Sequence, residues 1–301
     1  MIVGAGLAGL IAAHIFPDDV IEASPAPQAT HKALLRFRNQ EVSRVTGIDF
    51  TPVKVRKGVW SFDKNEFVAP SIRLANQYSS KCLNGWLAND RSIWNLEPCI
   101  RYIAPEDFYE QLLSNLADRV HWESPMDFAA KPQGLPLIST VPMDVVLGQL
   151  GIPTPDVTFN KESISVMRFR VRGCELYQTV YYPEPDFPIY RASITKDLLI
   201  IERAESDDDP GVGAVCRSFG VSESDIELLE STSQRYGKIA SIDDFTRKML
   251  IGKLTSEHGI FSLGRFATWK NILLDDVVND AMVIKKLLKA TDYERKLHQH
   301  K

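Results

Sequence analysis

The amino-terminal stretch Met1-Ile-Val-Gly4-Ala-Gly6-Leu-Ala-Gly9 decides the fold of this 301-residue chain. It predicts a short apolar strand, then a glycine-rich turn, then a small-residue helix that continues to about Ile15. In the pattern Gly4-x-Gly6-x-x-Gly9, the first glycine permits a tight turn and the second lets the backbone approach a pyrophosphate. The third lets the helix pack closely on the strand. The stretch therefore predicts the first unit of a Rossmann-like dinucleotide-binding fold.

An acidic residue follows where a bound ribose would need one. After a turn at residues 17–19, a second apolar strand ends at Glu22, whose carboxylate can accept hydrogen bonds from ribose hydroxyls. The pyrophosphate would bind at the start of the helix, where N–H groups lack helical partners and the dipole is positive. The next loop adds basic candidates for phosphate or cofactor contact, with a solvated helix face as the alternative: His31, Lys32, Arg36 and Arg38. The predicted cofactor-binding residues at this end of the chain are Gly4, Gly6, Leu7, Ala8, Gly9, Glu22, Ala23, His31 and Lys32.

Composition narrows the class of protein. Apolar and charged residues make up 44% and 25% of the chain, which is ordinary for a soluble protein. No apolar run approaches the roughly 18–20 residues that span a bilayer, so we expect no membrane partner. The net charge of −4 argues against a generally basic nucleic-acid binder, although a local basic groove is compatible with it. The apolar start has no basic region before it, so a secretory signal is not expected.

Cysteine and glycine spacing limits the cofactors. The four cysteines include no CxxC pair, which argues against a dithiol flavoreductase or a zinc site and fits a reducing cytoplasm. No Ser/His/Asp or metal-ligand constellation is evident, and we expect no metal. Gly211-x-Gly213 follows no strand and lacks a third glycine, so the chain has one nucleotide fingerprint. One fingerprint predicts one bound dinucleotide; the family resemblance described below implies that it is FAD, with any nicotinamide partner binding transiently.

The remainder of the chain predicts a second lobe. Residues 50–62 alternate apolar and polar, and residues 163–202 indicate successive strands of an antiparallel sheet. Helices are expected from about Ala33 and over residues 103–116 and 222–229. The expected fold is α/β, with a Rossmann-like FAD-binding lobe and a second lobe built on an antiparallel sheet. Its boundaries are residues 1–50, 100–145 and 252–291 for the FAD lobe, 51–99 and 146–251 for the substrate lobe, and 292–301 for a flexible tail.

The carboxyl end combines a buried strand, Gly259-Ile-Phe-Ser-Leu-Gly264-Arg265, with a following amphipathic helix. Together with the opening glycine loop, this segment resembles the FAD-dependent amine oxidase and UDP-galactopyranose mutase group. In that group the last strand and helix return to the FAD lobe, and the helix N-terminus faces the pyrimidine edge of the flavin. The resemblance implies that backbone around Asp276 and Val277 meets the flavin N1/O2 region. It also implies that Gly264 and Arg265 lie near the ribityl-phosphate.

Two further stretches are similar to the mutase branch. Val180-Tyr-Tyr-Pro-Glu-Pro-Asp-Phe-Pro-Ile-Tyr-Arg191 resembles the segment whose arginine borders the flavin and substrate, and Gly264-Arg-Phe-Ala-Thr-Trp-Lys270 resembles the carboxyl motif. The compact chain also resembles flavoproteins that bacteriophages encode for thymine hypermodification. In those, an FAD enzyme oxidises an amino acid attached through nitrogen to the base methyl and splits the C–N bond.

An amine oxidation of this type removes hydride from the carbon next to nitrogen, and water hydrolyses the resulting imine. Such a site needs a clamp for a substrate carboxylate, which the bidentate fork of Arg191 suits. It also needs an aromatic wall, for which Tyr181, Tyr190 and Trp60 are candidates. The alternatives are an ordinary strand arginine and tyrosines that pack in the core. The predicted catalytic residues are Arg191, Tyr190 and Tyr181.

Three functions are compatible with these patterns. The first is an FAD-dependent oxidoreductase or lyase acting on a C–N bond of a small-molecule or base-linked amine, with modified phage DNA as a candidate substrate. DNA binding would use a basic rim and weaken steeply with salt; its residues would be Lys54, Arg56, Lys57, Arg168, Arg170 and Arg172. The second is a mutase-like isomerase of a nucleotide sugar that needs reduced flavin, and the third is a non-catalytic FAD-binding protein. The expected location is the cytoplasm, that of the host if the chain is phage-encoded.

Overall fold

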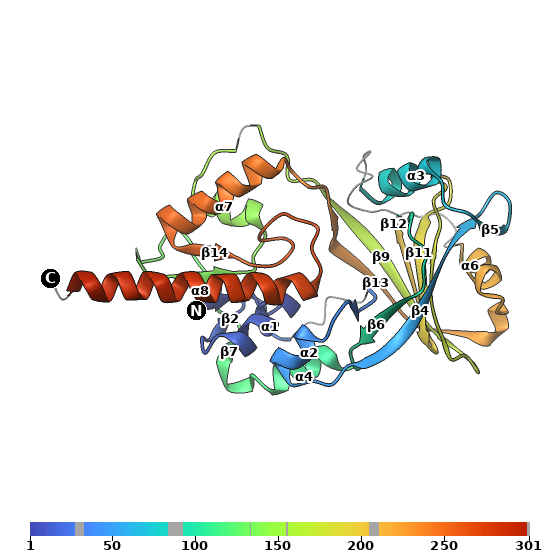
Figure 1. Ribbon diagram of the computed structural model, residues 1–301, viewed down its shortest axis with the longest axis horizontal. Coiled ribbons are helices and arrows are strands. Elements are labelled where there is room, and N and C mark those ends of the chain that lie inside the picture. Colours follow the sequence, from blue (N-terminus) through green and yellow to red (C-terminus); the bar gives the residue numbers. More distant parts are fainter. Residues whose placement is uncertain (28–32, 84–92, 133, 155, 205–210, 300–301) are drawn as a thin grey trace.

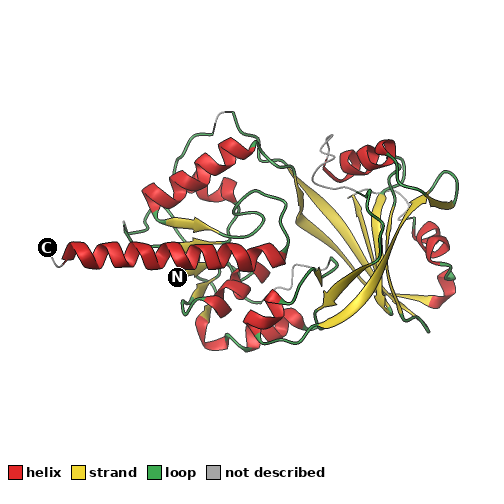
Figure 2. Cartoon of the chain, in the orientation of Figure 1, coloured by secondary structure: helices red, strands yellow, loops and turns green. Residues whose placement is uncertain are grey.

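The chain forms two lobes, each built on one sheet, in the computed structural model (Figure 1). Figure 2 shows helices around the short strands of the first lobe, whereas the long strands of the second lobe form a curled surface. No helix among the described residues is long and apolar enough to cross a membrane. The residues that the structure describes are 1–27, 33–83, 93–132, 134–154, 156–204 and 211–299.

The first lobe has a five-stranded sheet in which all neighbouring strands are parallel. In spatial order the strands are β14 (Ile260–Ser262), β8 (Leu137–Ser139), β1 (Ile2–Val3), β2 (Val20–Ile21) and β7 (Val120–His121). One face packs against α1 (Leu7–Ile15), α2 (Glu41–Thr46), α4 (Phe108–Ser114) and α8 (Leu274–Gln299). The other face packs against α5 (Met143–Gln149) and α7 (Asp244–His258), and a 3₁₀ helix, η1 (Ala117–Arg119), leads into β7. Helices on both faces of a parallel sheet define a doubly wound fold, whose ligands bind at the carboxyl ends of the strands.

The first and last elements of the chain meet in this lobe. Alternation along β1 places Ile2 in the core under α1 and α8, and Val3 in the core under α5 and α7. Lys285 Nζ of α8 donates to the carbonyl of Ile15 at the end of α1, at 2.8 Å. The carboxyl-terminal strand and helix therefore return to the glycine loop. α8 continues to Gln299, through most of the segment that the sequence suggested as a tail.

The second lobe has a nine-stranded sheet. Its neighbours are antiparallel except β10 and β4, which are parallel, so the sheet is mixed rather than wholly antiparallel. In order the strands are β13 (Ile226–Ile239), β9 (Lys161–Val171), β12 (Leu198–Ala204), β11 (Ile189–Lys196), β10 (Leu176–Tyr181), β4 (Thr51–Ser61), β6 (Cys99–Ile103) and β3 (Arg36–Phe37), with β5 (Glu66–Val68) paired to β4.

The two faces of the large sheet differ in what covers them. One face is apolar and packs against α6 (Val212–Phe219), through residues such as Val180, Ala192 and Ile201. The opposite face packs in part against α3 (Ile72–Leu83), through Val59, Val166 and Ile200. Neighbouring residues on a strand point to opposite faces, so polar side chains between those of the apolar face lie on the α3 side.

Two predicted helices are wrong. The segment after Ala33 forms β3, because Arg36 pairs with Ile103 of β6 and its side chain reaches across to β10 and β11; α2 begins only at Glu41. Within residues 222–229 there is only a short 3₁₀ helix, η2 (Glu223–Asp225), with a capping box at Ser222, and β13 begins directly after it at Ile226. Register shifts within β13 interrupt the two-residue period that would mark it as a strand.

Candidate functional site

The glycine loop leaves one side of its backbone open. Gly4 has φ +102°, which favours glycine, and a Cβ there would lie 2.3 Å from Thr140 Oγ1. A Cβ on Gly9 would lie 1.8 Å from the carbonyl oxygen of Gly4, so only glycine lets α1 pack this closely on the loop. Gly6 differs, because a Cβ there would meet no atom within 4 Å. The space beside Gly6 therefore admits a ligand.

The start of α1 offers hydrogen-bond donors to that space. Gly6 is the N-cap and supplies no side chain, and the first intrahelical bond runs from Leu10 N to Gly6 O at 3.0 Å. The N–H groups of the first turn, at Leu7, Ala8 and Gly9, therefore have no helical acceptor. Backbone donors with a positive helix end suit a pyrophosphate.

Glu22 lies beside the loop, as its predicted role requires. Its Oε2 accepts from Ala5 N at 2.7 Å, and its Oε1 accepts from Ser24 N at 3.0 Å and Ser24 Oγ at 3.2 Å. Each carboxylate oxygen can accept more than one hydrogen bond, so these contacts orient the group without exhausting it. Ala23 is exposed next to it. His31 and Lys32 lie outside the described residues.

The carboxyl-terminal turn packs on the same loop. Gly264 has φ +90°, and a Cβ there would lie 2.9 Å from Ala8 Cβ, so the turn after β14 contacts the first turn of α1. The guanidinium of Arg265 donates to the carbonyl of Ile272 at 3.2 and 3.0 Å. The structure thus places Gly264 against the glycine loop, 255 residues along the chain from Gly9. The contact of Gly264 and Arg265 with the cofactor stays a prediction.

The start of α8 is tied to the segment around Arg38. Asp275 is almost fully buried and accepts from the backbone N–H groups of Arg38 and Asn39 at 3.0 and 3.2 Å. Asp276 accepts from Leu273 N at 2.9 Å and pairs with the Arg38 guanidinium, and this pairing raises the pKa of Arg38. Val277 packs in the core, and its N–H bonds Leu273 O at 3.4 Å. The flavin contact of Asp276 and Val277 stays a prediction.

In the second lobe, Arg191 is held by a buried carboxylate. Arg191 Nε and NH2 donate to the two oxygens of Glu202 at 3.1 and 2.7 Å, and the Glu202 side chain is 1% exposed. Tyr190 OH donates to the same carboxylate at 3.0 Å, and Lys238 Nζ lies 3.6 Å from it. Burial opposes both charges, but Arg191 and Lys238 lower the pKa of Glu202, and Glu202 raises that of Arg191. One edge of the Arg191 fork is therefore engaged and does not by itself clamp a substrate carboxylate.

The predicted aromatic wall does not come together as one surface. Tyr190 is 1% exposed, and its hydroxyl is used by Glu202. Tyr181 packs edge-on against Tyr78, with ring centroids 5.4 Å apart, and burial raises its pKa. Trp60 lies in the core on the opposite face of the sheet, under α6, so it cannot share a wall with Tyr181.

The sequence did not indicate that several polar side chains gather on one face of the large sheet. Strand pairing places Tyr181 opposite Arg191, Thr179 opposite Ser193, and Arg191 opposite Glu202. Directly opposite side chains share a face. Arg36, for which the expectations were phosphate or cofactor contact or a solvated helix face, reaches this face from β3 and bonds Thr179 and Thr195. We call this surface the polar face; its members are Arg36, Thr179, Tyr181, Arg191, Ser193, Thr195 and Glu202.

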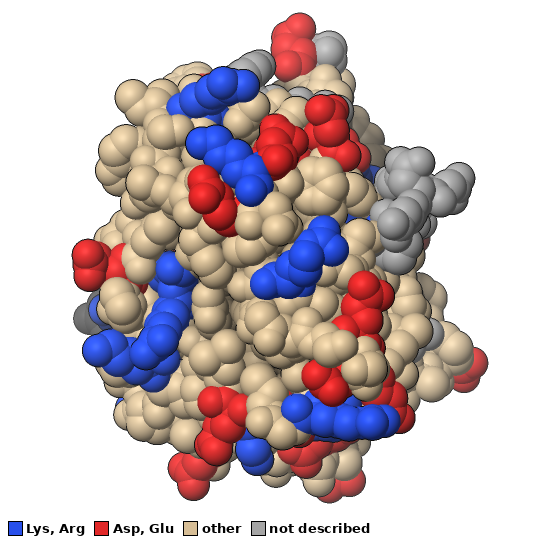
Figure 3. All heavy atoms as spheres, turned by 90° about the vertical axis from the view of Figure 1, so that its right-hand side faces the viewer, with Lys and Arg blue, Asp and Glu red and all other residues tan. Residues whose placement is uncertain are grey.

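The candidate basic rim is divided by the sheet. Lys54 and Arg56 alternate with Lys57 along β4, so they lie on the opposite face from it. β9 is separated from β4 by β12, β11 and β10, and Arg170 of β9 pairs with Asp197 at 3.0 Å. Figure 3 shows basic and acidic side chains interspersed over the outer end of the second lobe.

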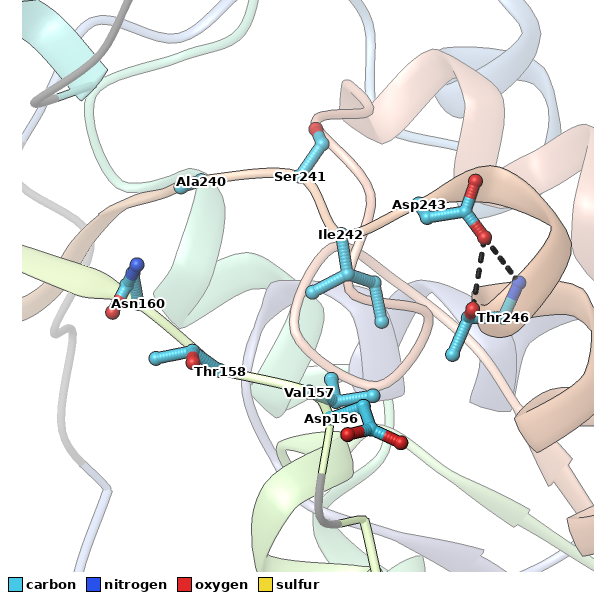
Figure 4. Close-up of a pocket in the computed structure, with 9 residues that line it drawn as sticks. All are labelled: Asp156, Val157, Thr158, Asn160, Ala240, Ser241, Ile242, Asp243 and Thr246. Atoms are coloured by element: carbon cyan, nitrogen blue, oxygen red, sulfur yellow. Dashed lines mark hydrogen bonds between the residues drawn. The ribbon is translucent and has the colours of Figure 1, made fainter.

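A hollow of about 220 Å³ lies between two of the segments that connect the lobes, the one before β9 and the one after β13 (Figure 4). Residues 156–160 form one side and residues 240–246 the other, and Asp243 caps α7 by accepting from Thr246 N at 2.8 Å. The only charged residues among those lining it are Asp156 and Asp243. An acidic lining does not suit an anionic ligand, and this hollow is distinct from the glycine loop and from the polar face.

Comparison with known proteins gives the fold its context. No protein-family model and no curated protein matches the chain. Among solved structures it is similar to a reduced UDP-galactopyranose mutase, with TM-score 0.68, 15% identity, and coverage of 96% of this chain and 93% of that one. An oxidoreductase from Methanosarcina mazei gives TM-score 0.61, 10% identity, and coverage of 95% and 99%. A complex of aklavinone-11 hydroxylase with FAD and aklavinone gives TM-score 0.51, 13% identity, and coverage of 93% and 60%.

At these identities the likeness establishes the fold and not the reaction. The predicted fold class is confirmed: the chain has the α/β fold of FAD-dependent flavoproteins, with a parallel Rossmann-like sheet and a second, mixed sheet. The glycine loop, the uncapped helix and the acid after β2 fit an adenine dinucleotide.

Proposed function

We propose that the protein is an FAD-dependent enzyme whose substrate binds on the polar face of the large sheet. One observation carries the proposal: the backbone beside Gly6 is open, while Gly4 and Gly9 are sterically required to be glycine. The first-turn N–H groups of α1 would hold the pyrophosphate and Glu22 the ribose. Bound FAD would supply two-electron oxidation or reduction of the substrate.

For the reaction, we propose the oxidation of a C–N bond in an amine that also carries an acidic group. Arg36 and Arg191 put positive charge on the polar face, which favours a substrate with a carboxylate or phosphate. Tyr181 adds aromatic surface on the same face. An amino acid joined through nitrogen to a thymine base has these features, and it is the particular substrate that the resemblance suggests.

A second candidate is the redox-neutral isomerisation of a nucleotide sugar. The observation favouring it is the same cationic face, because a nucleoside diphosphate is strongly anionic. The fold likeness to UDP-galactopyranose mutase is compatible with it. This reaction would start from reduced flavin and consume no external oxidant.

The test begins with the purified protein and its flavin absorbance. A chain that stays colourless and binds no FAD at micromolar excess would contradict the whole proposal. Anaerobic bleaching by a thymidine that carries an N-linked amino acid supports C–N oxidation. Turnover of a UDP-sugar only after reduction with dithionite supports the isomerase. Bound FAD with neither activity leaves a non-catalytic FAD-binding protein.

A further inference from the structure

Arg36 is a partly buried cation that pairs with no acidic side chain among the described residues. Its guanidinium donates to Thr179 Oγ1 at 2.9 Å, to Thr195 Oγ1 at 2.8 Å, and to the carbonyl of Ile194. All three acceptors are neutral. Burial, and then the charge of nearby Arg191, lower the pKa of Arg36 to about 10. Charges that are partly removed from water are normally paired, and Arg36 has hydrogen-bond acceptors but no counter-charge, so its surroundings favour an added anion.

Arg191 lies close enough to share that anion. It is on the same strand and the same face as Ser193, whose hydroxyl contacts Thr179 Oγ1 at 2.9 Å. Residues two apart on a strand, such as Arg191 and Ser193, are about 7 Å apart. The guanidiniums of Arg191 and Arg36 are therefore neighbours on the polar face. Glu202 engages Nε and NH2 of Arg191, and its NH1 bonds no described residue. Arg36 likewise uses one of the two NH1 hydrogens, at Thr179.

We propose that Arg36 and Arg191 together bind the anionic group of the substrate, a carboxylate or a phosphate. Thr179 and Thr195 position the Arg36 guanidinium, and Glu202 positions that of Arg191. Guanidinium suits this task because its planar fork forms charge-assisted hydrogen bonds with either oxyanion. The inference rests on the proposed function for the reaction, and it narrows the substrate class to anionic compounds. It also assigns Arg36 to the substrate rather than to the phosphates of FAD.

The test uses three probes that share a phenyl ring: benzoate, phenyl phosphate and neutral benzamide. Each is titrated into the FAD-loaded chain and followed by calorimetry. We expect at least one anion to bind and benzamide not to bind. Arg36→Gln should weaken anion binding roughly tenfold or more, because it removes charge-assisted hydrogen bonds. Arg44→Gln is the matched control, since Arg44 is exposed and pairs with Glu41 on α2 of the first lobe, and it should leave the affinity unchanged.

Equal binding of benzamide, or unchanged anion affinity in Arg36→Gln, would overturn the inference. The same titrations on the chain without FAD separate it from the proposed function. A chain that never retains FAD but binds the anion through Arg36 overturns the proposed function and keeps this inference. Anion binding that disappears when FAD is loaded means that the cofactor covers the arginines, and it overturns this inference. If Arg36→Gln does not fold, Thr195→Val replaces it, with several-fold weaker binding expected and unchanged binding as the contrary result.

Discussion

The two lobes build their sites from different parts of the chain. In the first lobe the site is backbone: strands of two or three residues, a glycine turn and the uncapped amides of α1. In the second lobe it is side chain: strands of up to 14 residues hold charged groups on one face of a long sheet. A backbone site depends on what small residues leave open, whereas a side-chain site depends on which strands pair. One added methyl group should therefore break the first, and one removed charge should break the second.

Gly9→Ala should have the largest effect. Alanine improves helix propensity by about 1 kcal/mol, but its Cβ would lie 1.8 Å from Gly4 O, which real atoms cannot tolerate. The loop and α1 must separate, at a cost that we expect to exceed the propensity gain, about 3 kcal/mol or more. Urea unfolding and FAD retention measure the result. Gly148→Ala is the control, because a Cβ there meets nothing within 4 Å; equal losses in the two variants would contradict a steric role for Gly9.

The first-lobe site could be predicted from the sequence because its signals are local. Gly4, Gly6, Gly9 and Glu22 lie within 22 residues, and their spacing alone encodes the turn, the helix start and the acid. The contact of Gly264 with this loop joins distant parts of the chain, and its prediction rested only on the resemblance to a family. Its physical cause is the close packing of the turn after β14 on Ala8.

The polar face could not be predicted in the same way. The Arg36 partners lie 143 and 159 residues away, and their proximity depends on the pairing of β10 with β11. Local signals there were misleading, since the expected helix from Ala33 would have removed Arg36 from the sheet. Glu202 was also missed, although it directly follows the apolar run Leu198–Ile201 on the same strand, and a charged residue in such a buried strand indicates a buried partner.

Glu202→Gln should have the next largest effect, on the second lobe. It removes the charge that neutralises Arg191 and Lys238, and Lys238 is only 6% exposed on its side chain. Breaking a buried ion pair costs about 3–5 kcal/mol. Because the glutamine amide keeps part of the hydrogen bonding, we expect the free energy of unfolding to fall by about 3 kcal/mol. Asp197→Asn is the control, because its pair with Arg170 is about one-third exposed and should contribute about 1 kcal/mol or less. Similar losses in urea unfolding would contradict a special role for the Glu202 network.

The same network predicts a dependence of stability on acid. Burial acts to raise the pKa of Glu202, but Arg191 and Lys238 dominate and lower it from 4.5 to about 2. The unfolded chain then binds more protons between these values, so this contribution to stability is complete above pH 4.5 and is lost as the pH falls towards 2. The difference in unfolding free energy between wild type and Glu202→Gln should shrink across that window. A difference that stays constant from pH 6 to pH 3 would show that Glu202 does not titrate as the structure implies.

Gly6→Ala should have the smallest effect on stability and is the sharpest test of the comparison. Gly6 has φ −72°, which alanine adopts freely, and a Cβ there meets no protein atom within 4 Å, so the unfolding free energy should stay within about 0.5 kcal/mol of wild type. The added methyl group would instead occupy the approach of the pyrophosphate, and FAD affinity should fall roughly tenfold or more, about 1.4 kcal/mol. Fluorescence titration with FAD measures the affinity, and thermal unfolding without FAD measures the fold. A variant that is unchanged in both would mean that the open side of the loop faces only solvent, and the first lobe would then lack the backbone site that distinguishes it from the second.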